Sequence, residues 1–446
     1  MSNQQRAEQV DHQLVRAIGV PGLTANIVNA TIGAGSFVLP ASMAAGLGAA
    51  APLAFVCCAV AMAIFVTCFA IAGSRVSLTG GLYAYVEVAF GRYVGFLAGI
   101  LYVLSAVGAV AGIVNVFVNS IAGIVPLLGN SVLRIIVMAL VYGILVWINV
   151  RGVREGAGAV TLVTIAKLLP ILVFIGAGIF FIHPANLAWS DWPSSKSLGE
   201  NIILLMFAFV GIEVALIPSG EVKNPNRTVP RSIYLALGLT TVIYLMIQFV
   251  GQGTLGASTL GQFKDTPEGL ATAATSFLGH IGKPLMLAGA TISAFGFVTS
   301  DILSSPRMIF ALGRDGTLPP WFAHVHQRYR TPDVGIYVYT AIAFVLSVSG
   351  SFEQLALLSN VAVLLMYLLC FAGCWKLLQD ENSAPAGRER ALSFPGMKIM
   401  PLIAIIVVLW ILAHATIREY AVNAIVLVIA SLAYLVRAAL RREPKG

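Results

Sequence analysis

Charged residues are scarce in this sequence. Of its 446 residues, only 10% are Asp, Glu, Lys or Arg, whereas 58% are hydrophobic, and the mean hydropathy is +0.89. A soluble domain of this size carries about a quarter charged residues. The composition therefore excludes an ordinary soluble domain and predicts a protein that crosses the bilayer many times.

Residue patterns that would indicate an enzyme are also missing. No Gly-x4-Gly-Lys-Ser/Thr loop is present, which argues against the use of ATP. No spacing of His, Cys and acidic residues suggests a metal site, and no nucleophile–base pattern falls within an apolar run. We expect no enzyme activity, no cofactor and no metal. All five cysteines lie in apolar runs, so no disulfide framework is indicated: Cys57, Cys58, Cys68, Cys370 and Cys374.

A cleavable secretory leader is not indicated either. The first sixteen residues are polar, and no small-residue cleavage site follows a short apolar stretch. The first apolar run is therefore expected to stay in the protein. We count twelve apolar runs, at about 19–46, 49–73, 93–124, 132–150, 157–182, 200–220, 232–252, 281–312, 333–350, 354–377, 399–415 and 419–440.

The positive charges are distributed unevenly along these runs. With the N-terminus in the cytoplasm, 21 of the 27 Lys and Arg residues fall on the cytoplasmic side. This bias is typical of membrane proteins and predicts that both termini are cytoplasmic, in the cell membrane, here the inner membrane of a bacterium. It also explains the net charge of +8 without a nucleic-acid partner. The exceptions are Lys167, within a span, and five outer residues: Arg134, Lys196, Lys264, Lys283 and Arg418.

The connections suggest how the chain is organised. Residues 74–92 are expected to form a short amphipathic helix at the inner face, 253–280 an outer lid, and 313–332 a polar inner loop. We divide the chain into a cytoplasmic tail (1–18), a core of ten helices (19–378), a linker (379–398), two further helices (399–440) and a basic tail (441–446).

The first span contains a pattern that breaks helices. Gly33 and Gly35 bracket Ala34 halfway along it, and glycine is unfavourable in a helix interior. In hydrocarbon, a broken helix is tolerated only where protein or a cavity meets the freed backbone groups. If the helix resumes at Ser36, its first amide groups form a site for a carboxylate. The alternative is close helix packing through small residues.

The sixth span carries a second interruption. Glu213 lies in mid-span two residues after Gly211, where an acid is costly unless it faces the protein interior. This span opens a second set of five, so the two breaks stand at corresponding positions. Paired breaks of this kind point to an inverted-repeat transporter with its site between them.

Several motifs now resemble one family. They occur in order at 32–37 (IGAGSF), 80–85 (GGLYAY), 90–92 (FGR), 220–231 (GEVKNPNRTVPR), 306–307 (PR) and 314–319 (RDGTLP). Together they make the chain similar, over nearly its whole length, to the amino acid–polyamine–organocation (APC) superfamily of secondary transporters. The resemblance implies an all-α integral membrane fold with twelve transmembrane helices. Helices 1–5 and 6–10 would form a five-plus-five inverted repeat, with helices 1 and 6 broken at mid-membrane.

The resemblance also implies where a substrate binds. The carboxylate of an amino acid would meet the backbone at Gly33, Ala34 and Gly35, with Ser36 as a further donor. Some relatives have serine in place of Ala34. The ammonium group of the amino acid would meet the carbonyl oxygens of Thr31, Phe207 and Val210, and the Phe207 ring would act as a gate.

Three ionisable residues lie deep in the predicted spans: Lys167, Glu213 and Asp301. In sodium-independent members of this superfamily, a lysine at the position of Lys167 replaces a sodium ion beside the first helix. It would serve as a proton carrier or only as a brace. Glu213 would take part in proton coupling or, as we favour, tie the sixth helix to its neighbours. For Asp301 we favour a salt bridge to Lys167, against a contact with a cationic substrate, a proton site or no role.

These observations predict a secondary transporter of L-amino acids that works by alternating access. It would be sodium-independent and act by proton symport or exchange. Its partners would be the amino acid substrate, protons and the lipid bilayer, with a homodimer possible. The alternative substrate class is amines, polyamines or cationic amino acids bound by Asp301. A channel would differ by lacking saturable uptake.

Overall fold

The computed structural model describes residues 19–75, 82–152, 157–188, 192–213, 222–223, 225–379 and 395–440. Both predicted tails, most of the predicted linker and several motif residues lie outside these ranges (Gly80, Gly81, Gly220, Glu221 and Asn224). So does most of the second half of the sixth predicted span.

The described residues form helices joined by short connections. In chain order the α-helices are α2 (Val20–Thr31), α3 (Gly35–Leu47), α4 (Ala51–Arg75), α5 (Leu82–Phe90), α6 (Arg92–Ala122), α7 (Ser131–Val150), α8 (Ala157–Gly178), α9 (Ser195–Leu205), α10 (Pro225–Leu255), α11 (Ala257–Gly261), α12 (Glu268–Leu278), α13 (Gly282–Ser304), α14 (Pro306–Arg314), α15 (Asp333–Ser349), α16 (Phe352–Gln379), α17 (Met400–Leu412) and α18 (Ile417–Leu440).

The helices are those of a protein that crosses the membrane several times. Eight helical stretches of the described residues are long and apolar enough to span a bilayer, and α15 and α17 are shorter apolar helices. The all-helical class is therefore confirmed. The number of twelve spans and the inverted repeat stay predictions.

Three predicted segments have a defined shape in the structure. The predicted run 281–312 is two helices, α13 and α14, that meet at Ser305. The predicted lid, 253–280, contains α11 and α12. The short helix expected within 74–92 is α5, which buries Leu82, Tyr85 and Val86.

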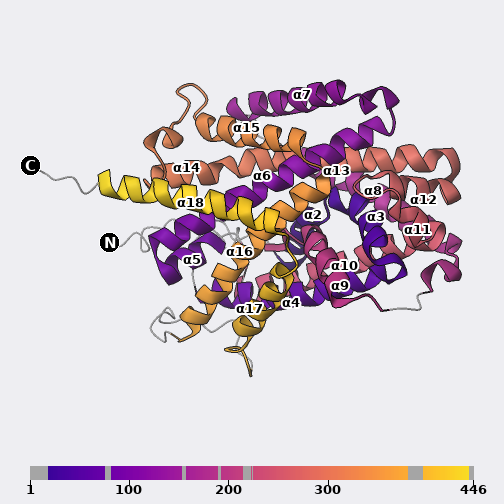
Figure 1. The fold of residues 1–446 in the computed structure, drawn as a ribbon, viewed down its shortest axis with the longest axis horizontal. Coiled ribbons are helices and arrows are strands. Elements are labelled where there is room, and N and C mark those ends of the chain that lie inside the picture. The colour runs from indigo at the N-terminus through magenta and orange to yellow at the C-terminus, as the bar shows by residue number, and fades with distance from the viewer. Residues whose placement is uncertain are drawn as a thin grey trace, which may run out of the picture.

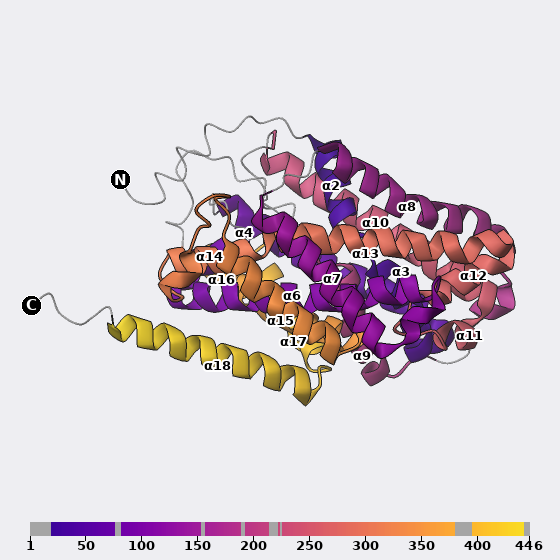
Figure 2. The ribbon, with the colours of Figure 1, turned by 90° about the horizontal axis from the view of Figure 1, so that it is seen from above.

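The bundle is elongated, and these segments lie at its two ends. Figure 1 places α5 and α14 toward one end of the long axis and α11 and α12 toward the other, and Figure 2 agrees for α14, α11 and α12. Between them, α16 packs against α6, and α10 packs against α2 and α4. In Figure 2, α18 runs along the edge of the bundle.

The distribution of apolar side chains fits a bilayer environment. In the interior, where α4 meets α16, four aromatic rings pack against one another: Phe65, Phe69, Tyr367 and Phe371. By contrast, α18 exposes large aliphatic side chains along its length, among them Leu432, which is 57% exposed. Such a continuous apolar surface is rare on soluble proteins.

Candidate functional site

The first span is interrupted halfway along its length, as predicted. The helix α2 ends at Thr31, and Ile32 turns to an extended conformation with φ −76° and ψ 93°. The next helix, α3, begins at Gly35, one residue before the predicted start at Ser36. The chain therefore exposes backbone polar groups between two helices that are otherwise apolar.

The start of α3 leaves amide groups without a partner. The amides of Ser36 and Phe37 donate to the carbonyls of Gly33 and Ala34, at 3.2 and 3.1 Å. The Ser36 hydroxyl also donates to the Gly33 carbonyl, at 2.7 Å, so its hydrogen is already used. No described residue accepts a hydrogen bond from the amides of Gly33, Ala34 or Gly35. Because the positive end of the helix dipole lies here, these three amides favour an anion.

An aromatic pair covers this group of amides. Phe207 lies in a 3₁₀ turn (Met206–Ala208), and its ring meets that of Phe352 edge to face, with the centroids 5.3 Å apart. A Cβ atom on Gly35 would lie 3.2 Å from Cδ1 of Phe207. The structure thus puts the ring against the break, and its action as a gate stays a prediction.

The second predicted break is described as far as Glu213, and this part of it touches the first break. After α9 and the 3₁₀ turn, Gly211 has a φ of +106°, which L residues with a side chain rarely adopt. A Cβ atom at Gly211 would lie 3.1 Å from the carbonyl oxygen of Ala30, near the end of α2. The two interruptions therefore meet backbone to backbone, at a position that requires glycine.

Glu213 satisfies the backbone of its own break. Its Oε2 atom accepts a hydrogen bond from the Gly211 amide at 2.9 Å. This contact is local to the sixth span, so the tie to neighbouring helices that we favoured for Glu213 stays a prediction. Its part in proton coupling stays a prediction.

A tyrosine that we did not single out from the sequence joins the two breaks. The hydroxyl of Tyr244, on α10, contacts the carbonyl oxygens of Thr31 at 2.9 Å and Ala208 at 2.8 Å. Tyr244 is buried, with 1% of its surface exposed. One hydroxyl hydrogen thus serves one carbonyl from each broken helix.

An asparagine supports the second break from the other side. Nδ2 of Asn360, on α16, donates to the carbonyls of Ile203 and Leu204 at 2.7 and 3.1 Å. These carbonyls lie in the last turn of α9, where no further amide groups of the helix follow to donate to them. Asn360 therefore holds the end of α9 in place.

Lys167 binds the first broken helix through its backbone. Its Nζ atom donates to the carbonyl of Asn29 at 2.6 Å, and only 8% of its surface is exposed. On the previous turn of α8, the Thr164 hydroxyl donates to Oδ1 of Asn29 at 3.0 Å. The ammonium group therefore lies against the first helix, and its role as a proton carrier or only as a brace stays a prediction.

The predicted salt bridge between Lys167 and Asp301 is wrong. No such pair occurs among the ion pairs of the described residues. Asp301 lies three residues before the end of α13, where it accepts hydrogen bonds from the hydroxyls of Ser305, at 2.8 Å, and Tyr339. The Asp301 carboxylate binds hydroxyl groups instead, and the Lys167 ammonium group binds a backbone carbonyl.

The predicted site residues thus fall into two groups. Those around the breaks lie together: Thr31, Gly33, Ala34, Gly35, Ser36, Phe207, Val210 and Glu213. Lys167 joins this group because it binds the carbonyl of Asn29, two residues before Thr31. Asp301 stands apart, within the contact between α13 and α15. Tyr244 and Asn360 were missed, although each is a polar residue inside an apolar run, which was a usable signal.

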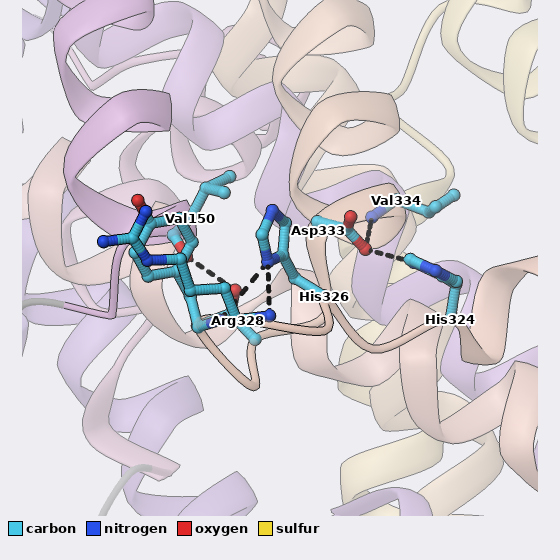
Figure 3. Close-up of polar contacts among 8 residues, drawn as sticks. Val150, His324, His326, Arg328, Asp333 and Val334 are labelled. Carbon is cyan, nitrogen blue, oxygen red and sulfur yellow. Dashed lines mark hydrogen bonds and ion pairs between the residues drawn. The ribbon is translucent and has the colours of Figure 1, made fainter.

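A further polar cluster lies between α14 and α15 (Figure 3). Nδ1 of His324 is 2.7 Å from Oδ1 of Asp333, which also accepts from the amide of Val334 at 2.9 Å. These contacts fix the start of α15. They form no group of metal ligands among the described residues.

The same segment is tied to the end of α7. The Thr331 hydroxyl donates to the Val150 carbonyl at 2.7 Å, and Nδ1 of His326 accepts from the amide of Arg328 at 3.2 Å (Figure 3). The predicted polar loop is therefore an ordered connection that braces two spans.

A multi-pass helical protein whose two interrupted helices meet at their breaks has the construction of a secondary membrane transporter. The sequence model of the amino acid permease family matches residues 18–434. The chain belongs to that family, and it is a transport protein rather than an enzyme.

Characterised relatives support the assignment over most of the chain. A serine/threonine exchanger, SteT, of Bacillus subtilis (strain 168) is 28% identical over 89% of this chain and 90% of its own length. The branched-chain amino acid permease BcaP of the same strain is 24% identical, over 91% and 89%. A methylthioribose transporter of that strain is also 24% identical, over 91% and 89%.

Proposed function

We propose that this protein carries L-amino acids across the cell membrane by alternating access. The observation that supports this most directly is the set of unpaired amides at Gly33, Ala34 and Gly35. Three amides at a helix N-terminus suit the carboxylate that all amino acids share. In a cavity within the membrane, such a ligand is also the means of satisfying these donors.

The ammonium group of the substrate would bind on the opposite side of the breaks. We assign it to the carbonyls of Thr31, Phe207 and Val210. The Thr31 carbonyl already receives the Tyr244 hydroxyl, and a carbonyl oxygen has two lone pairs, so it can accept a second donor. Phe207 would close over the bound substrate.

We further propose that transport is independent of sodium and is coupled to protons or to exchange. Lys167 supports this, because its ammonium group already binds a carbonyl of the first broken helix. A second cation at the same carbonyl would meet like-charge repulsion in a region of low dielectric constant. Proton symport would require Lys167 or Glu213 to release and rebind a proton in each cycle.

An amine carrier that uses Asp301 is the alternative substrate class, and the structure offers it less support. The Asp301 carboxylate is already engaged by Ser305 and Tyr339. We therefore leave Asp301 out of the proposed substrate contacts.

The decisive experiment is uptake into proteoliposomes. The panel contains radiolabelled serine, threonine, leucine, lysine, putrescine and methylthioribose, with and without a pH gradient and with choline in place of sodium. We expect saturable uptake of at least one neutral amino acid, unchanged by choline. Uptake of putrescine or methylthioribose alone would contradict the proposed substrate, and a sodium requirement would contradict the role of Lys167.

A further inference from the structure

A cavity of about 390 Å³ lies next to the paired breaks, outside the proposed substrate site. It is formed by the last turns of α6, the first turns of α7, the connection from α15 to α16, and Asp265 in the lid segment. Its polar lining includes Asn115, Asn119, Arg134 and Gln354. The size is sufficient for a small amino acid together with water.

The cavity carries one charge of each sign. Among the described residues that line it, Arg134 and Asp265 are the ionisable ones. They do not form an ion pair with one another, and no described carboxylate lies within 4.0 Å of the Arg134 guanidinium group. Instead Nη1 of Arg134 donates to Oδ1 of Asn119 at 2.7 Å. The guanidinium group therefore retains donors for an anion.

Asp265 is held in place by three helices. Its Oδ1 atom accepts from the amide of Glu353, on α16, at 2.7 Å. Its own amide donates to the hydroxyl of Ser42, on α3, at 3.4 Å, and its carbonyl accepts from Nδ2 of Asn119, on α6, at 3.5 Å. Its φ of +65° is uncommon for a residue with a side chain, so these contacts offset some backbone strain.

Asn115 adds a fixed acceptor to the lining. Its Nδ2 atom donates to the carbonyls of Ser347 and Gly350, at 3.0 and 3.2 Å, which sets the orientation of the amide. No described residue donates to its Oδ1 atom, and the side chain is 5% exposed. Because Asn115 lines the cavity, this oxygen is available to a donor on a ligand.

The cavity also adjoins the proposed substrate site. Phe352 lines it, and the Phe352 ring contacts the ring of Phe207, which in turn lies against Gly35. Two aromatic rings therefore separate the cavity from the unpaired amides of the first break.

We propose that this cavity is a second binding site for the zwitterionic head of an amino acid. The carboxylate binds the guanidinium group of Arg134, and the ammonium group binds the carboxylate of Asp265 and Oδ1 of Asn115. A zwitterion compensates both charges of the lining, whereas a simple anion or cation leaves one of them unpaired. This inference rests on the proposed function, since it names a holding site for the same substrate before it passes the Phe352–Phe207 pair.

Occupancy of this site depends on pH. Burial raises the pKa of Asp265 above its ordinary range, against the opposing effects of hydrogen bonds from Ser351 and the Glu353 amide and of the nearby Lys264 charge. As the pH falls through this raised value, the carboxylate becomes neutral and the ammonium group loses its partner. The second site should therefore empty at a less acidic pH than an exposed aspartate would require. The other charged groups near Asp265 are Arg134, which lines the cavity, the adjoining Lys264, and Glu353, whose backbone amide donates to it.

Equilibrium binding to the full chain in lipid nanodiscs tests the proposal. The probes are radiolabelled L-serine, L-threonine and L-leucine. For whichever of them binds, we expect two molecules per chain in the wild type. In Arg134→Gln and in Asp265→Asn, we expect one bound molecule per chain, because the affinity of the second site falls at least tenfold. The Asn side chain at position 265 keeps an acceptor for the Glu353 amide. The control is Arg418→Gln, an exposed arginine outside the cavity that was predicted on the same face; it should still bind two.

The number of molecules bound per chain distinguishes the second site from the proposed function. One molecule bound in the wild type, or two in Arg134→Gln, overturns the second site while leaving the proposed function intact. No amino acid bound to the wild type contradicts the proposed function and this inference with it. If Arg134→Gln does not fold, titration of the wild type decides instead. Binding should fall from two to one on acidification, and a constant value overturns the proposal.

Discussion

The two broken helices satisfy their backbone groups in different ways. At the second break, described side chains serve part of the backbone: Glu213 pairs with the Gly211 amide, and Asn360 holds the end of α9. The first break keeps the amides of Gly33 and Gly35 unpaired among the described residues. Incomplete pairing is costly inside a membrane, so it marks the place where a ligand finishes the structure. In the proposed binding mode, the first break therefore takes the carboxylate, and the carbonyls of Phe207 and Val210 at the second break take part in binding the ammonium group.

The strongest test of this comparison is Gly35→Leu. The new side chain would meet Phe207 and fill the space above the unpaired amides, so saturable uptake should be abolished. Gly143→Leu is the matched control, because Gly143 lies exposed on α7 with nothing within 4 Å of its Cβ position. Uptake by Gly35→Leu at the wild-type rate would remove the substrate from the first break.

Gly211→Ala should damage the contact between the two breaks. The positive φ is strained for alanine, and the Cβ atom would press on the Ala30 carbonyl. We expect a loss of about 2–4 kcal/mol of stability, together with weaker substrate binding. Thermal unfolding in detergent measures this, with Gly238→Ala on α10 as the control, since its Cβ position is open. Equal melting temperatures for the two variants would show that the breaks do not depend on each other.

Lys167→Met should affect the first break alone. It removes a charged donor and leaves the Asn29 carbonyl unpaired, at a cost of about 1.5–3 kcal/mol. It should also abolish the response of uptake to a pH gradient. Lys376→Met is the control, because Lys376 makes the same kind of bond, to the Ala89 carbonyl at 2.8 Å, far from the breaks along the chain. An unchanged pH response in Lys167→Met would limit Lys167 to bracing.

Tyr244→Phe should weaken both breaks slightly. It removes one shared hydrogen bond without creating a large cavity, so we expect a stability loss of about 1 kcal/mol. The affinity for substrate should fall severalfold, because the Thr31 and Ala208 carbonyls are no longer held together. Thermal unfolding and binding assays on one preparation give both values. A wild-type affinity would show that the positions of these two carbonyls do not matter for binding.

Local features of the site could be predicted from the sequence. Gly33 and Gly35 located the first break within one residue, since helix propensity depends on the residues themselves. The buried Lys167 required an interior partner, and a carbonyl of the first helix is where the structure provides it.

Contacts between helices were harder to predict. Asp301 and Lys167 were paired because both are charged, yet the rotation of α13 turns Asp301 toward Tyr339. In a soluble helix, one polar face fixes that rotation, whereas a helix that is apolar on nearly all sides offers no such pattern. For the same reason Tyr244 and Asn360 could be noticed as polar residues, but their partners could not be named.

The Tyr244 hydroxyl affects the relative free energies of the loaded and the empty protein. It holds a single hydrogen within reach of two oxygens, those of Thr31 and Ala208. When an ammonium group occupies the Thr31 oxygen, the phenol can turn wholly to the other oxygen, and it turns back when the ammonium leaves. Neither the loaded nor the empty protein is then left with a stranded acceptor. A carrier that must load at one face and unload at the other needs these two forms to be nearly equal in free energy, and one freely rotating hydroxyl helps to keep them so.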